Sequence, residues 1–220
     1  MTTGDVIAKL KERFPDKIAE AKTPVDDMVL VTVPREHAVE VSDYVFNQWH
    51  ARFVIAAGTD YREITGEYLV DYNFSLAADH IFLTLRVPVK AGDPWIEAIT
   101  KKVPAANWAE REIQDILGVK LTGHPDPRRL VLADDWPEGL HPLRRDVPYD
   151  SWPDHNEERK PPMADPPPGA TVVPIGPFFP VLEEPAYFRV FVEGEKVVGC
   201  DSRGFYNHRG IEKVADSQLN

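Results

Sequence analysis

The chain has 220 residues, of which 43% are hydrophobic and 28% charged, and its formal net charge is −11. This length suffices for one large domain with an appendage, and the composition is that of a globular protein with a real core. The negative charge argues against nucleic acid and against an anionic membrane surface as partners.

Cysteine content and the absence of familiar motifs restrict the chemistry. The one cysteine, Cys200, cannot by itself hold an iron–sulfur cluster or a structural zinc ion. The sequence has no glycine-rich phosphate loop and no nucleophile elbow. We therefore expect no cofactor, no metal and no catalytic centre in this chain. The sequence contains no run of about 18 apolar residues, so we expect no direct membrane insertion. The N-terminus lacks an apolar signal core, which predicts a cytoplasmic protein.

The first hundred residues show alternating helical and extended patterns. Helices are predicted over residues 4–14 and 35–52, and strands over 26–34 and 52–61. Residues 67–76 and 79–89 predict two strands of a hairpin. This order predicts an α+β fold, a two-layer sandwich of helices on a mixed β-sheet.

Residues 107–118 carry the clearest helix pattern in the chain. Asn107 is predicted to cap the helix, Glu110 follows at capping-box spacing, and Gly118 suits a left-handed stop. The predicted buried face consists of Ala109, Ile113, Ile116 and Leu117. The predicted outer side carries Glu110, Arg111, Glu112 and Asp115.

Proline dominates the second half of the chain. Residues 147–170 predict an extended linker, and residues 186–200 predict a small β-hairpin that turns near Glu193 and Gly194. We expect an α+β domain at residues 1–122, an extended Pro- and Arg-rich arm at 123–170 and a separate C-terminal segment at 171–220, the truncated start of a larger protein.

Histidines and carboxylates in this arm raise the question of a metal site. The candidate ligands are His124, Asp126, His141, Asp146 and His155. Their spacing matches no common metal pattern. Polar loop residues that hydrogen-bond to the backbone explain them better.

Two arginine pairs, Arg128–Arg129 and Arg144–Arg145, lie among carboxylates. Grooves that follow a phosphate backbone have a basic excess, which this stretch lacks. Arginine suits bidentate pairing with carboxylates at interfaces. We therefore interpret the stretch as a surface that grips another protein, with arginines in exposed ion pairs in the free chain.

Residues 108–146 resemble the 30-kDa subunit family of complex I. The shared pattern is EREIQDILG, then GHPDPRR, then HPLRRD. Ile116 and Pro127 depart from it, where an aromatic residue and a leucine are usual. The resemblance implies partner docking by Glu110, Arg111, Glu112, Asp115, His124, Asp126, Arg128, Arg129, His141, Arg144, Arg145 and Asp146.

The tail has a second resemblance. IGPFFPVLEEPAYFRVFVEGEKVV, followed by GFYNHRGIEK with His208, Arg209 and Glu212, is similar to the start of the large subunit of complex I and of the large subunit of membrane-bound nickel–iron hydrogenases. Phe179 stands where quinone-reducing members have a histidine. That departure and the DDWPEG run at 134–139 favour the hydrogenase side.

Together the resemblances imply a non-catalytic scaffold subunit. Its implied partners are the large subunit and the iron–sulfur subunit of the same complex, in a cytoplasmic arm on the inner face of the cell membrane. NADH dehydrogenase and hydrogenase both remain open at this point. The alternatives are a stand-alone metal-dependent enzyme that uses His124, Asp126 and His141, and an orphan truncated fragment.

Overall fold

The computed structural model describes residues 1–151, 153–154 and 162–217. The chain divides into two compact units, Met1–Pro127 and Arg128–Asn220. The predicted division into three segments, with boundaries at 122 and 170, stays a prediction.

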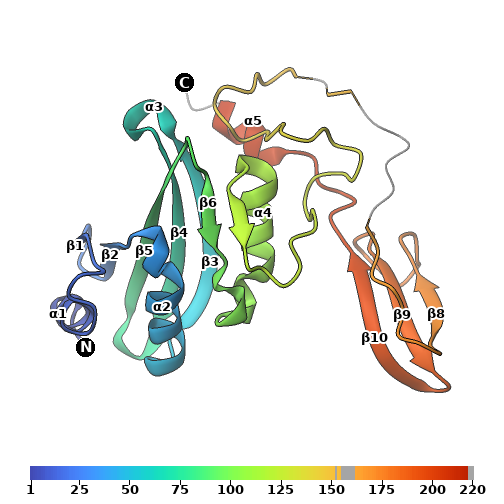
Figure 1. Cartoon of the computed structure of the whole chain (residues 1–220), viewed down its shortest axis with the longest axis horizontal. Helices are drawn as coiled ribbons and strands as arrows, with labels where there is room; N and C mark the ends of the chain where they lie inside the picture. The colour runs from blue at the N-terminus through green and yellow to red at the C-terminus, as the bar shows by residue number, and fades with distance from the viewer. Residues whose placement is uncertain (152, 155–161, 218–220) are drawn as a thin grey trace. The chain divides into compact units, whose positions relative to one another are not determined.

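A five-stranded mixed sheet forms the centre of the first unit (Figure 1). Its order is β1-β2-β5-β4-β3, with β2 parallel to β5 and the other pairs antiparallel. The strands are β1 (Glu20–Lys22), β2 (Met28–Thr32), β3 (Arg52–Tyr61), β4 (Glu67–Leu76) and β5 (Ile81–Lys90). The predicted strands at 52–61 and 67–76 have the observed bounds, and the α+β class with a mixed sheet is confirmed.

Helices and a short second sheet complete this unit. The helices are α1 (Thr3–Arg13), α2 (Ala38–Asp43), α3 (Arg62–Thr65) and α4 (Asn107–Leu117). The predicted helix at 35–52 is confirmed in part: residues 35–48 are helical, but they form a 3-10 turn (Arg35–His37), α2 and a π-helix (Tyr44–Gln48) in succession, and the helical stretch ends at Gln48. Strands β6 (Trp95–Glu97) and β7 (Lys120–Thr122), which no local pattern predicted, pair in parallel and flank α4 in the chain.

The core lies between one face of the sheet and the helices. Every second residue of β4 on this face is almost fully buried: Tyr68, Val70, Tyr72 and Phe74. Helix α4 packs against β3 where Gly58 leaves room for it, because a Cβ atom there would lie 2.5 Å from Leu117 Cδ1 and 3.2 Å from Ile113 Cγ2. The small volume at Gly58 thus sets the distance between helix and sheet.

The second unit is built on a three-stranded antiparallel sheet of order β10-β9-β8. Its elements are β8 (Thr171–Ile175), β9 (Tyr187–Glu193), β10 (Lys196–Arg203) and the helix α5 (Ile211–Ser217). Only two strands were expected from the sequence, because Pro174 within β8 concealed the third. Between Thr122 and Thr171 the described residues contain no helix or strand.

We predict that Gly58→Val destabilises the first unit by about 1–3 kcal/mol, because the added methyl groups overpack the contact with α4. Chemical denaturation measures the free energy of unfolding. Ala57→Val is the matched control, since Ala57 is the exposed neighbour on the same strand. Equal stability of the two variants would contradict this account of the helix–sheet contact.

Candidate docking site

The first acidic residue of the motif helix lies inside the first unit. Glu110 is 0% exposed. Its carboxylate accepts hydrogen bonds from the Tyr72 hydroxyl at 2.8 Å and from the Ile99 amide at 2.8 Å. It also accepts from the amide and the hydroxyl of Thr100. Four donors from two other elements therefore converge on one side chain of α4.

This arrangement corrects the predicted helix start. Residue Ala106 occupies the N-cap and makes no side-chain capping bond, so the capping box of Asn107 and Glu110 is wrong. The predicted outer side of α4 is wrong as well, since Glu110, Arg111 and Asp115 are buried. Gly118 ends the helix in the left-handed conformation at φ 75°, as predicted.

Tyr72 shares the environment of Glu110. Burial and the neighbouring Glu110 carboxylate raise the pKa of the Tyr72 hydroxyl well above its usual value. The hydroxyl therefore keeps its proton and remains a donor to Glu110 across the physiological range. A hydrogen bond to a charged acceptor in a buried site is stronger than one between neutral groups.

Two further side chains of α4 hold the segment that leaves the helix. Arg111 is 7% exposed and its guanidinium lies 3.4 Å from the Asp126 carboxylate. Gln114 donates to the Pro127 carbonyl at 2.9 Å and accepts from the Leu121 amide at 3.1 Å. The motif helix thus fixes the course of residues 121–127 through both charge and amide contacts.

His124 belongs to the same turn. Its Nδ1 accepts a hydrogen bond from the Asp126 amide at 3.0 Å, which places the proton of the neutral ring on Nε2. The side chain is buried, with 8% exposure. Burial lowers the pKa of His124 below its ordinary 6.5, and this effect outweighs the attraction of Glu110 for the charged ring.

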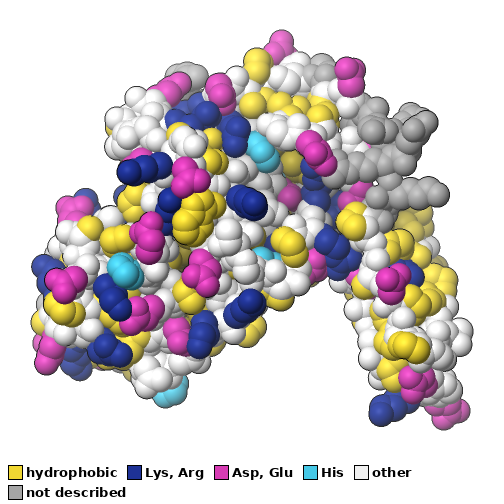
Figure 2. Space-filling view, in the orientation of Figure 1, with side chains coloured by type: hydrophobic (Ala, Val, Ile, Leu, Met, Phe, Trp, Pro, Cys, Tyr) yellow, Lys and Arg dark blue, Asp and Glu magenta, His cyan; other side chains and the backbone are white. Residues whose placement is uncertain are grey.

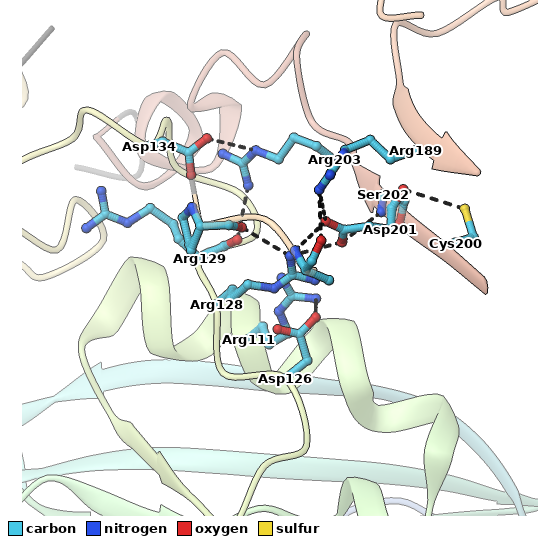
Figure 3. Close-up of polar contacts among 12 residues, drawn as sticks. Arg111, Asp126, Arg128, Arg129, Asp134, Arg189, Cys200, Asp201, Ser202 and Arg203 are labelled. Atoms are coloured by element: carbon cyan, nitrogen blue, oxygen red, sulfur yellow. Dashed lines mark hydrogen bonds and ion pairs between the residues drawn. The ribbon is translucent and has the colours of Figure 1, made fainter. Parts of the chain in front are cut away.

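In the second unit, one buried carboxylate brings several basic groups together. Asp201 on β10 is 7% exposed. It lies 3.0 Å from Arg128 Nη1 and 3.7 Å from Arg189 Nη1, and it accepts from the Ala164 amide at 2.9 Å (Figure 3). The expectation of an exposed ion pair at Arg128 is therefore wrong, because its acidic partner is buried.

The remaining predicted docking residues lie at different depths. Arg129 is half-buried and donates to the Ala133 and Trp136 carbonyls. Glu112, His141 and Arg144 are also half-buried, whereas Arg145 and Asp146 are exposed. In the tail, Arg209 and Glu212 are exposed, and His208 Nε2 lies 3.1 Å from the Glu212 carboxylate. The role of these residues in docking stays a prediction.

The candidate metal ligands do not form a group in the part of the chain that the structure describes. No three His, Cys, Asp or Glu side chains there are arranged to hold a metal ion. His124 and Asp126 contact each other within one turn, and His155 lies outside the described residues. The same described residues include no helix long and apolar enough to cross a membrane.

Comparison with known proteins places the motif in a family. Residues 31–152 match the model of the respiratory-chain NADH dehydrogenase 30 Kd subunit. The chain belongs to this family. An NADH-quinone oxidoreductase subunit of Geotalea uraniireducens is 31% identical over 143 residues, which are 64% of this chain and 85% of that protein.

Two more similarities extend this result. Hydrogenase-4 component G of Escherichia coli K12 is 37% identical over 97% of this chain and 39% of that protein. This match includes most of the tail, so both predicted resemblances are confirmed, and the chain spans about two-fifths of that relative's length. A chain of the archaeal membrane-bound sulfane sulfur reductase has a similar fold, with a TM-score of 0.54, 19% identity and coverage of 66% of this chain and 85% of that chain.

We predict that Glu110→Ala destabilises the first unit by at least about 3 kcal/mol, because it leaves several buried donors without an acceptor. Thermal and chemical unfolding measure the loss. The control is Glu12→Ala, which removes an exposed carboxylate from α1. A cost as small as that of the control would show that the buried carboxylate does not hold α4 in place.

A second prediction concerns pH. Since the folded pKa of His124 lies below the unfolded value of 6.5, its contribution to stability is complete above pH 6.5 and is lost as the pH falls through the folded pKa. His124→Asn retains an acceptor for the Asp126 amide and removes the titration. Its free energy of unfolding should fall less between about pH 7 and pH 5 than that of the unmodified chain.

The control for this experiment is His80→Asn. His80 is exposed and has a positive φ of 55°, which asparagine tolerates. The free energy of unfolding of His80→Asn should fall between about pH 7 and pH 5 by the same amount as that of the unmodified chain. Identical pH profiles for all three proteins would contradict the assigned role of His124.

Proposed function

We propose that this chain is a non-catalytic scaffold subunit of a complex I-like NADH dehydrogenase or of a related membrane-bound hydrogenase. In this role it docks a large subunit next to an iron–sulfur subunit in the cytoplasmic electron-transfer arm. Family membership supports the proposal, as does the match of nearly the whole chain to a hydrogenase component.

The observation that carries the proposal is the use of the motif side chains. Glu110, Arg111 and Gln114 bind neighbouring segments of the chain itself. Arg111 and Gln114 fix the course of residues 121–127, and the three side chains do not converge on a common point where a substrate atom would react. Motif side chains that bind their own chain in this way suit a protein whose role is to present a rigid binding surface.

Surface charge is consistent with a protein partner. Figure 2 shows Lys and Arg side chains interspersed with Asp and Glu over the visible face, without a continuous patch of one sign. Mixed charges of this kind determine the orientation and specificity of a protein–protein encounter more than its raw affinity. We assign the docking role to the exposed residues of the motif, Arg145 and Asp146, and to Arg209 in the tail.

The test is assembly with the large and iron–sulfur subunits of the same complex. Arg145→Glu should reduce the recovery of the large subunit in co-purification by about tenfold, because like charges then face each other across the interface. The midpoint of thermal unfolding should hardly change, since an exposed ion pair contributes only about 0–1 kcal/mol.

Lys11→Glu on α1 is the matched control, as it reverses an exposed charge outside the motif. It should assemble like the unmodified chain. Failure of the unmodified chain to co-purify with either partner would overturn the proposed function. Normal assembly of Arg145→Glu would remove Arg145 from the docking surface.

A further inference from the structure

The first unit contains buried polar atoms for which the described residues supply no hydrogen-bond partner. Two of them belong to the motif region, namely Oδ1 of Asn107 and Nε2 of His124. The third is Ser42 Oγ in α2, whose hydroxyl can rotate towards a main-chain carbonyl one helical turn earlier. Buried polar groups are nearly always hydrogen-bonded, either to protein or to ordered water. The two atoms of the motif region therefore need an explanation.

The two atoms have complementary hydrogen-bonding roles. Because Nδ1 of His124 accepts from the Asp126 amide at 3.0 Å, the neutral ring carries its proton on Nε2, and Nε2–H needs an acceptor. Oδ1 of Asn107 is a carbonyl oxygen and needs a donor. Asn107 does not use this oxygen to cap α4, since the N-cap is Ala106 and no side chain caps the helix. One unused donor and one unused acceptor thus remain inside the unit.

Both side chains lie at the same place in the fold. Burial is the largest influence on the pKa of His124 and lowers it, whereas the Glu110 carboxylate and the Asn107 main chain raise it. A main-chain hydrogen-bonding group acts on a ring only at short range, so the first residue of α4 lies beside His124. The Asn107 side chain and the ring nevertheless make no direct hydrogen bond. Neighbouring polar atoms that are not bonded to each other are the usual setting of a bridging water molecule.

The chemistry of the two atoms restricts what can bind between them. A ligand has to accept from Nε2–H of His124 and to donate to Oδ1 of Asn107. A simple anion has no donor for the oxygen, and the Glu110 carboxylate, which is 0% exposed, acts on the same ring. A simple cation has no acceptor for Nε2–H, and the positive charge of Arg111 also acts there. A small neutral molecule with both functions fits, and water is the smallest of these.

We propose that one internal water molecule binds between the His124 ring and the Asn107 side chain. It accepts from Nε2–H and donates to Oδ1, and it thereby joins the first residue of α4 to the turn at 123–126. Such a water molecule is part of the fold, because its removal leaves two buried polar groups unsatisfied. The inference goes beyond the proposed docking role and does not depend on it.

The first test is NMR spectroscopy of the full chain with 15N-labelled histidine, above the ordinary pKa of the imidazole. The Nε2–H proton of His124 should exchange slowly with solvent and should show cross-relaxation with a long-lived water molecule. His124→Asn assigns the signal by removing it, and the ring of the exposed His80 should give no such signal. A neutral His124 ring with its proton on Nδ1, or an Nε2–H proton without cross-relaxation to water, would overturn the inference.

Variants of the full chain assign the second partner of the water molecule. In Asn107→Ala the Nε2–H proton of His124 should exchange with solvent about tenfold faster, because the water molecule is then held by one hydrogen bond fewer. Asn47→Ala is the matched control, since it removes an exposed asparagine of the same unit that also makes a side-chain hydrogen bond, to Asp43. It should leave the exchange rate unchanged. Equal rates in the two variants would contradict the role of Asn107.

A crystal structure of the unmodified full chain, at a resolution that shows ordered water, gives a readout that needs no variant. One density peak should lie within hydrogen-bonding distance of both His124 Nε2 and Asn107 Oδ1. A direct hydrogen bond from Nε2–H to Oδ1 or to the Asn107 carbonyl, with no peak between the side chains, would refute the proposed water site.

Discussion

The structure of the first unit depends on a buried negative charge. Glu110 receives donors from β4 and from the turn at Ile99 and Thr100. Transfer of a carboxylate from water to the protein interior is costly unless hydrogen bonds compensate for it. The compensation here is specific, because the donors come from two other elements and converge on one side chain of α4. The helix then fixes residues 121–127 through Arg111 and Gln114, so the polar anchor determines where the arm begins.

Local patterns predicted much of this unit. Alternation in β3, β4 and β5 located the strands to within a few residues, and Gly118 marked the end of α4. The role of Glu110 could not be predicted in the same way. An acidic residue three positions after an asparagine is typical of a capping box, and periodicity assigns charged residues to the exposed side. Only the tertiary donors Tyr72, Ile99 and Thr100 turn this side chain inward, and they lie 10 to 38 positions away.

The arm could not be predicted for a different reason. Its residues lack periodicity, and its main-chain groups bind side chains that come much later in the chain. The sequence predicted the arginines as interface residues, which stays a prediction, and it assigned Arg128 to an exposed pair. The buried partner, Asp201, lies 73 positions away on a strand whose local pattern is ordinary. The sequence motif identified Arg128 as a residue of interest. Its buried partner, Asp201, could be identified only from the three-dimensional structure.

Arg203 on β10 donates to the main-chain oxygen atoms of Arg129, Leu130 and Leu132. Every residue type, proline included, presents a carbonyl, so positions 129, 130 and 132 can exchange their side chains without loss of these three acceptors. Arg203 has no such freedom, because lysine lacks the planar array of donors. The two sides of this contact thus differ in what they require: the acceptors need only a main chain at positions 129, 130 and 132, whereas the donor needs an arginine at position 203.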